Sequence, residues 1–405
     1  MAVRTNVLVI NKKRKEKTMK KTLAMILALC MIFALCACGQ TAAPAPAQEA
    51  AAPAEAAAAP AEEAGEDLTW GFTPFAEPQT LRLGFFTGSP LSYPYLFADK
   101  LGVFDALNID VEYTCFTGGP AMMEAGKDWD VCSLGMGGIC IGLSAYDYTF
   151  IDVNDYEENM ALFVRADSEL AKDPTNPDLW KGAEVVYPTG TTAQMFLAAY
   201  LNSLGLTLAD VTSTNADNAN ALTVFNGGTG DALCCWNAIA LAADDTGYFR
   251  VSDAGQMGIP TLCGTFTHPD FLKNNLDLIA TVVGVFHRAT EWVYESDENM
   301  QQAADWYYEH CEEEGFLCTE EVALKTMQWF RGPTTEEYIA KFTNTTKDED
   351  GLFTDRDILE IEDDILLGYD FFVSEGKYSP EQRQTWLTDA RVDNSVALAV
   401  ADMIG

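Results

Sequence analysis

The sequence has few of the residues on which metal sites and acid–base catalysis depend. Its 405 residues include three histidines, and none of its 11 cysteines form the Cys-x-x-Cys spacing of a zinc site. It shows no paired carboxylates, no Ser–His arrangement and no phosphate-binding glycine loop. These absences argue against catalysis, so we expect no metal, no cofactor and no enzymatic activity.

Positive charge is also scarce outside the N-terminal region. The formal net charge is −36, and eight of the 25 lysines and arginines lie before Cys38. The rest of the chain is therefore a polyanion, which repels nucleic acid and anionic lipid. We expect no nucleic-acid partner. Solubility alone accounts for such a surface, so the charge indicates no specific function.

The N-terminal region has the parts of a bacterial secretory signal. A basic start at Met19 precedes an apolar run over residues 23–34, and Leu35-Cys36-Ala37-Cys38 is similar to a lipobox. The run is too short to span a membrane comfortably. We predict a signal peptide over residues 1–38, starting at Met19, and a lipidated Cys38 on the outer face of the bacterial cell membrane. An uncleaved anchor helix is the alternative.

A spacer and a large body follow the signal. Residues 39–67 are mostly Ala, Pro, Glu and Gln, a composition that cannot bury a core. We expect a disordered linker there, holding the body away from the membrane. The body, residues 68–405, is too long for one ordinary core and suits two lobes.

Strand-like and helix-like segments alternate through this body. Alternating or apolar runs at 81–85, 109–113 and 131–134 each precede a glycine-containing turn and a helix-like segment. A second series begins at 184–187, and the helix after it has a single apolar stripe from Ala193 to Leu204. This order predicts parallel βαβ units and an α/β fold. After about residue 275 the pattern predicts mostly helix.

Eight cysteines lie in the body. Several of them fall within apolar strand-like runs, which predicts buried thiols without disulfides. Cys311 and Cys318 are near enough in sequence for a local disulfide, and the sequence leaves that pairing open.

Six short motifs occur in order along the body. They are Leu81-Arg82-Leu83-Gly84, the segment 98–104, Gly118-Gly119-Pro120-Ala121, the segment 180–185, Thr189-Gly190-Thr191-Thr192-Ala193 and the segment 231–237. Together they resemble the substrate-binding proteins of ABC importers, specifically the nitrate, sulfonate and taurine receptors and their thiamine-precursor relatives. Asn237 stands where the family has an acid, and Met136-Gly137 replaces a polar pair, so these departures leave the ligand open.

The resemblance implies a two-lobed α/β clamshell of the periplasmic-binding-protein type 2 class, with two chain crossovers. Lobe 1 would contain residues 68–160 and 262–405, and lobe 2 would contain residues 161–261. Hinge closure would trap a small organic anion such as a sulfonate, taurine or nitrate in the interlobe cleft. The closed form, a monomer, would then dock on an ABC permease in the membrane.

The residues also support a physical account of such a cleft. Ligands of parallel α/β sheets gather at the carboxyl ends of the strands, where helix N-termini offer free N–H groups and partial positive charge. The predicted ligand-binding residues are Gly88, Ser89, Tyr93, Gly118, Gly119, Gly135, Met136, Gly137, Thr191, Thr192, Trp236 and Asn237. For the glycines and threonines, a merely tight turn is the alternative.

Aromatic residues near these turns keep other ligands open. Tyr93 and Trp236 adjoin polar turns and favour a flat ligand, such as a pyrimidine or an aromatic acid. Phe85 and Phe116 are expected in the core instead. A lipoprotein that senses a ligand without transporting it is a further alternative.

Overall fold

The computed structural model describes residues 68–86, 88, 90–259, 261–330, 332–348, 351 and 356–404. The chain divides into two units, Met1–Ala64 and Gly65–Gly405, and every described residue belongs to the second. The predicted signal, the predicted linker and Cys38 lie outside the described residues. Within the described part, none of the helices has the length and apolarity that crossing a membrane requires.

The first of two five-stranded sheets has the strand order β2-β1-β3-β10-β4. Its strands are β1 Gln79–Phe86, β2 Ile109–Phe116, β3 Val131–Gly135, β4 Thr149–Glu157 and β10 Thr261–Thr267. Strand β1 runs parallel to β2 and β3, and Leu83 pairs with both Tyr113 and Val131. Strand β10 is antiparallel to β3 and β4. The parallel strands therefore end at one edge of the sheet.

The second sheet repeats this pattern in the order β7-β6-β8-β5-β9. Its strands are β5 Ala161–Val164, β6 Glu184–Tyr187, β7 Thr212–Asn215, β8 Ala232–Cys235 and β9 Phe249–Asp253. Strand β6 is parallel to β7 and β8, and β5 is antiparallel to β8 and β9. The chain crosses between the sheets after β4 and again before β10, so the predicted α/β class with two crossovers is confirmed. We propose lobes with the predicted boundaries.

Lobe 2 carries helices between its strands. They are α6 Glu169–Lys172, α7 Pro177–Trp180, α8 Thr192–Ser203, η2 Leu208–Asp210, α9 Asn218–Asn226, α10 Asn237–Asp245 and α11 Ala254–Met257. The predicted stripe on α8 faces the core, because Ala193, Phe196 and Leu197 are fully buried. Gly205 follows the helix with φ +75°, a conformation that glycine adopts without strain.

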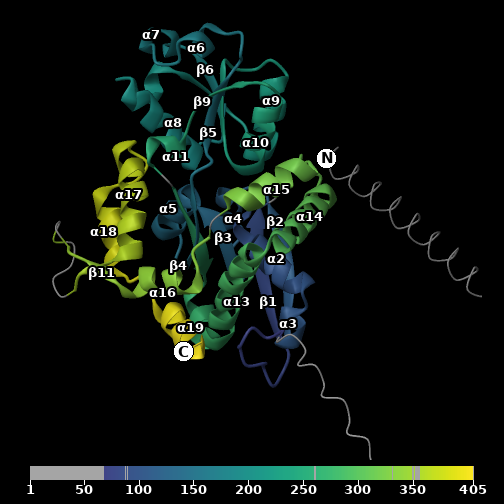
Figure 1. Ribbon diagram of the computed structural model, residues 1–405. Coiled ribbons are helices and arrows are strands. Elements are labelled where there is room, and N and C mark those ends of the chain that lie inside the picture. The colour runs from purple at the N-terminus through teal and green to yellow at the C-terminus, as the bar shows by residue number, and fades with distance from the viewer. Residues whose placement is uncertain are drawn as a thin grey trace, which may run out of the picture. The chain divides into compact units, whose positions relative to one another are not determined.

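Lobe 1 has helices from both ends of the body (Figure 1). Those before the first crossover are η1 Pro90–Ser92, α2 Tyr93–Lys100, α3 Val103–Ala106, α4 Gly119–Glu124 and α5 Met136–Ala145. The predicted helical C-terminal part contains α12 Pro269–Asn274, α13 Leu276–Glu295, α14 Asp297–Glu314, α15 Glu320–Trp329, α16 Thr335–Thr343, α17 Glu360–Ser374, α18 Pro380–Thr388 and α19 Ser395–Ile404, with the short hairpin β11 Thr345–Thr346 and β12 Ile358–Leu359.

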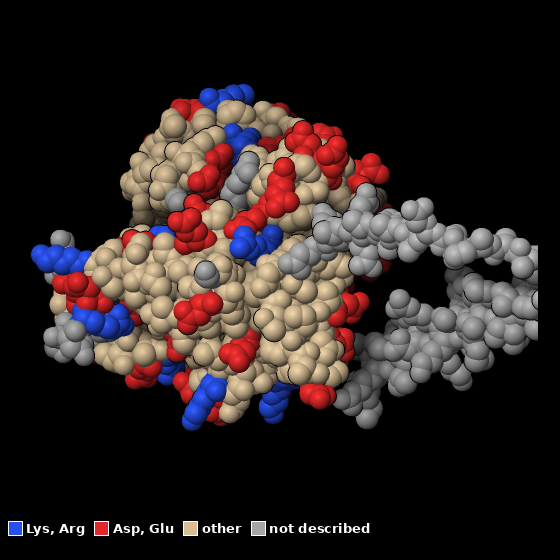
Figure 2. Space-filling model, turned by 60° about the horizontal axis from the view of Figure 1, so that its bottom comes forward, with Lys and Arg blue, Asp and Glu red and all other residues tan. Residues whose placement is uncertain are grey.

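The described cysteines are thiols, and the surface carries more acidic than basic side chains, as the composition predicts. No disulfide joins the described cysteines: Cys311 and Cys318 are thiols, and six of the eight cysteines are buried. A hydrogen bond from Cys318 lowers the pKa of the Cys311 thiol, and the same contact raises the pKa of Cys318. Acidic side chains spread over the face in Figure 2, interspersed with fewer basic ones.

Candidate ligand-binding site

A cavity of about 510 Å³ lies between the two lobes. Its walls include the ends of β1, β3 and β4, the turns after β2, β6, β7 and β8, and the loop between α14 and α15. This is the edge at which the parallel strands of both sheets end, the usual ligand position in open α/β sheets. The volume lies within the range of about 300–1,000 Å³ typical of small-molecule sites.

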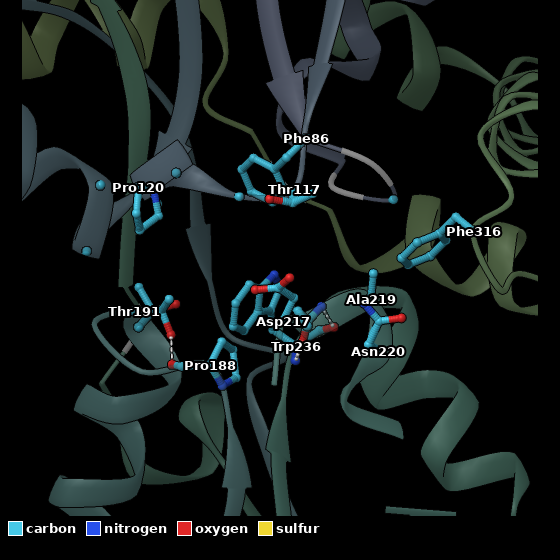
Figure 3. A pocket seen from close by; sticks show the side chains of 18 of the residues that line it. Phe86, Thr117, Pro120, Pro188, Thr191, Asp217, Ala219, Asn220, Trp236 and Phe316 are labelled. Atoms are coloured by element: carbon cyan, nitrogen blue, oxygen red, sulfur yellow. Dashed lines mark hydrogen bonds between the residues drawn. The ribbon is translucent and has the colours of Figure 1, made fainter. Parts of the chain in front are cut away.

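Five helices begin at this cavity. The lining residues include the starts of α4, α5, α8, α9 and α10. The first turns of these helices present backbone N–H groups without intrahelical partners, and the dipoles give these ends partial positive charge. The Thr191 hydroxyl is already engaged, because it donates to the Pro188 carbonyl oxygen at 2.6 Å (Figure 3).

Gly137 brings the two lobes into close contact beside the cavity. A Cβ at Gly137 would lie 2.4 Å from the Gly190 carbonyl oxygen and 2.8 Å from the Thr191 Cα. No side chain fits between these backbones, so glycine is required at the start of α5. Gln194 of α8 strengthens the contact: its Oε1 accepts from the Gly190 N–H at 2.8 Å and from Lys377 Nζ of lobe 1 at 2.9 Å.

Aromatic side chains form parts of the wall. Trp236 precedes α10, and its backbone exchanges two hydrogen bonds with the Asn218 side chain, at 3.2 and 3.3 Å. Phe86 faces Trp236 from the other lobe (Figure 3). Phe316 lies at one side and packs on Gly88, where a Cβ would overlap its ring. These rings offer surfaces for the organic part of a solute.

The charged groups at the cavity are acidic. Among the described lining residues, Glu157, Asp217 and Glu314 are carboxylates, and none is Lys, Arg or His. Glu157 is only 3% exposed, and its Oε1 accepts from Asn237 Nδ2 at 2.9 Å. Burial raises the pKa of Glu157 from its ordinary 4.5 to about 7, although hydrogen bonds from Cys263 and Asn237 oppose the shift.

The structure brings most of the predicted ligand-binding residues to one place. Eight of them line the cavity: Gly88, Gly118, Gly119, Gly135, Gly137, Thr191, Thr192 and Trp236. Ser89 lies outside the described residues. Tyr93, Met136 and Asn237 are described, and they do not line this cavity.

The side chain of each of the three is held elsewhere, two by packing and one by a hydrogen bond. Tyr93 begins α2 and lies in an apolar cluster, with its ring 4.5 Å from that of Tyr307 in α14. Met136 begins α5 and packs against Gly368 of α17, where a Cβ would come within 2.5 Å of its side chain. Asn237 lies behind Glu157 and holds it, so its role is positioning rather than lining.

Several residues that line the cavity were not predicted from the sequence. Glu157 ends β4, and its position at the carboxyl end of a strand is a signal that was available. Asp217 precedes α9 as a helix N-cap, a second usable signal. Phe316 lies far along the chain in the loop after α14, and no local pattern points to it. Among the described residues, no cluster of His, Cys, Asp or Glu is arranged to hold a metal ion.

Comparison with known proteins agrees with this geometry. Residues 147–300 match a protein-family model described as NMT1/THI5 like. The match covers less than half of the chain. The matched stretch contains both crossovers, the whole second sheet and Glu157. No curated protein sequence matches the chain.

Solved structures share the fold over most of the chain. The alkanesulfonate-binding protein SsuA from Xanthomonas axonopodis pv. citri, bound to MOPS, is 16% identical with a TM-score of 0.59, covering 80% of this chain and 99% of that one. The aliphatic sulphonate binding protein SsuA from Escherichia coli is 17% identical with a TM-score of 0.58, covering 76% and 92%. The nitrate-binding protein NrtA from Synechocystis PCC 6803 is 14% identical with a TM-score of 0.56, covering 81% and 91%.

These comparisons confirm two predictions. The fold is that of the periplasmic binding proteins, with two lobes and two crossovers. The resemblance to the nitrate and sulfonate receptors and their thiamine-precursor relatives is also confirmed, through the matched domain and the shared fold.

Proposed function

We propose that this chain is the extracytoplasmic solute-binding component of an ABC importer and captures a small organic solute in the interlobe cavity. The observation that carries the proposal is the convergence of five helix N-termini and three aromatic side chains on one cavity of suitable volume. The match to the NMT1/THI5-like family model and the periplasmic-binding-protein fold support the same role. Lipidation at Cys38 would keep the protein beside its permease.

The proposed solute carries an anionic group such as a sulfonate or carboxylate. The N-termini of α5 and α8 support this, because neither helix has an acidic residue in its first turn to compete for the exposed N–H groups. Trp236 supports the flat alternative, an aromatic acid or a pyrimidine, because an indole face can stack on such a ring.

Thermal unfolding of the purified full chain against sulfonates, nitrate, aromatic acids and pyrimidines tests the proposal. A solute at about a hundred times its dissociation constant adds roughly 2.7 kcal/mol to the free energy of unfolding, which raises Tm by several degrees for a chain of this size. Trp236→Ala should remove that shift. Trp329→Ala is the matched control, because Trp329 is exposed and does not line the cavity. An unchanged Tm across the whole panel would contradict the proposal.

A further inference from the structure

A solute with only negative charge is bound best beside basic side chains, whereas the charged side chains at this cavity are acidic. Described lining residues supply three carboxylates and no basic side chain. Lys377 is not among the lining residues, and its Nζ donates to Gln194 Oε1 at 2.9 Å. Helix N-termini attract an anion at this cavity, while the carboxylates repel it at short range.

One of these carboxylates lies beside a helix N-terminus, a position that favours an anion. A Cβ at Gly135, at the start of α5, would lie 3.9 Å from Glu157 Oε2 and 3.7 Å from Thr192 Cγ2 at the start of α8. The Glu157 carboxyl group therefore lies beside the N-cap residue of α5, and the first residue of α8 lies close to the same glycine. The chain thus supplies its own anion at the place where helix dipoles would otherwise hold an anionic solute.

The position of Glu157 is fixed by its surroundings. Asn237 donates to it through Nδ2 while adopting φ +51°, and the Asn237 backbone N–H is held by Asn159 Oδ1 at 3.2 Å. Few non-glycine residues take this left-handed conformation, and asparagine tolerates it best. A buried, oriented carboxyl group facing a cavity is a preorganised acceptor.

We propose that Glu157 determines specificity by binding a protonated amine or amidine, so that the solute is a zwitterion or an organic cation rather than a bare anion. This inference rests on the proposed function, since it assigns one pole of the solute in the same cavity. The raised pKa of Glu157 supports the inference, because it marks a buried carboxyl group without a counter-charge, which a cationic nitrogen would supply.

The inference predicts how the site rejects other solutes. A bare anion next to Glu157 places two like charges together in a partly dry site, and an isosteric solute without the nitrogen leaves the carboxylate unpaired. The site then discriminates among solutes in two ways. It repels a bare anion, and it leaves Glu157 without a partner when the solute lacks the cationic nitrogen.

Isothermal titration calorimetry with matched pairs tests the inference on the full chain. The pairs are taurine with 1-propanesulfonate, β-alanine with butyrate, and 4-aminopyrimidine with pyrimidine. We expect the nitrogen-bearing member of at least one pair to bind roughly 10- to 100-fold more tightly, the range for a hydrogen bond to a charged group. Glu157→Gln should abolish that preference. Glu158→Gln, an exposed acid next in sequence that does not line the cavity, should keep it.

The outcomes separate this inference from the proposed function. Equal or tighter binding of the member without the nitrogen overturns the role of Glu157 and leaves solute binding standing. A preference that survives in Glu157→Gln also overturns it. Absence of binding across all pairs and the wider solute panel overturns both proposals. The wild-type comparison within each pair holds even if the variant is unstable.

Discussion

At the end of β4, Glu157 titrates in a different pH range from an exposed glutamate. Its pKa is raised from 4.5 to about 7, mainly by burial, so the folded chain takes up a proton at higher pH than the unfolded chain. The stability from this group is fully present below its ordinary pKa and is lost as the pH rises through about 7. At about 1.4 kcal/mol per unit, the loss is on the order of 3 kcal/mol.

We therefore expect Glu157→Gln to be more stable than the wild type in alkaline solution. The amide cannot ionise, so its free energy of unfolding should exceed that of the wild type by up to about 3 kcal/mol near pH 8.5, and by little near pH 5. Urea unfolding at the two pH values measures the difference. Cys263, the titratable neighbour that donates to Glu157, is unchanged in the variant. Parallel pH profiles for variant and wild type would contradict the expectation.

Among the elements, the start of α5 limits how closely the lobes can approach. The Cβ of Gly137→Ala would meet backbone atoms of the Gly190–Thr191 turn at 2.4 and 2.8 Å, and backbone cannot move aside as a flexible side chain can. We expect the lobes to be held apart, at a cost of roughly 1–3 kcal/mol for overpacking. That corresponds to about 5- to 150-fold weaker solute binding. Stability without solute should change less, because alanine favours the helix.

A second glycine serves as a control for whether the close approach of the two backbones causes the weaker solute binding. Gly118 also lines the cavity, but a Cβ there would meet nothing within 4 Å, so Gly118→Ala should bind solute nearly as the wild type does. Small-angle scattering with and without solute would detect an open form of Gly137→Ala. Wild-type affinity in Gly137→Ala would show that the two backbones need not approach this closely.

The elements also show where sequence reasoning succeeds and fails. The turns after the parallel strands were predictable, because glycine and threonine at strand–helix junctions identify that edge of the sheet. The directions of Tyr93 and Met136 were not, since each is the first residue of a helix and its face depends on the helix packed against it. Phe316 was unpredictable for another reason: only the packing of α14 and α15 brings its loop back to the cavity.

At the scale of the whole molecule, the lobes are joined by more than the two crossovers. Helix α15, from the C-terminal half, packs against α10 of lobe 2, and one buried apolar cluster includes Met327 of α15 together with Leu241 of α10. The sequence-based division assigns these helices to different lobes. This buried apolar contact is therefore a further connection between the lobes, besides the two chain crossovers.

The acidic excess acts on the molecule as a whole. With a net charge of −36, repulsion among carboxylates opposes the compact state. Raising NaCl from about 0.01 M to about 0.1 M shortens the Debye length from about 30 Å to about 10 Å. We expect Tm at neutral pH to rise by a few degrees, because the repulsion outweighs exposed pairs such as Lys325–Glu321, which salt weakens. Calorimetry in NaCl and in KCl measures the shift, and equal shifts exclude binding of one particular cation. A Tm that falls with salt would mean that ion pairs, not the acidic excess, dominate the electrostatics of folding.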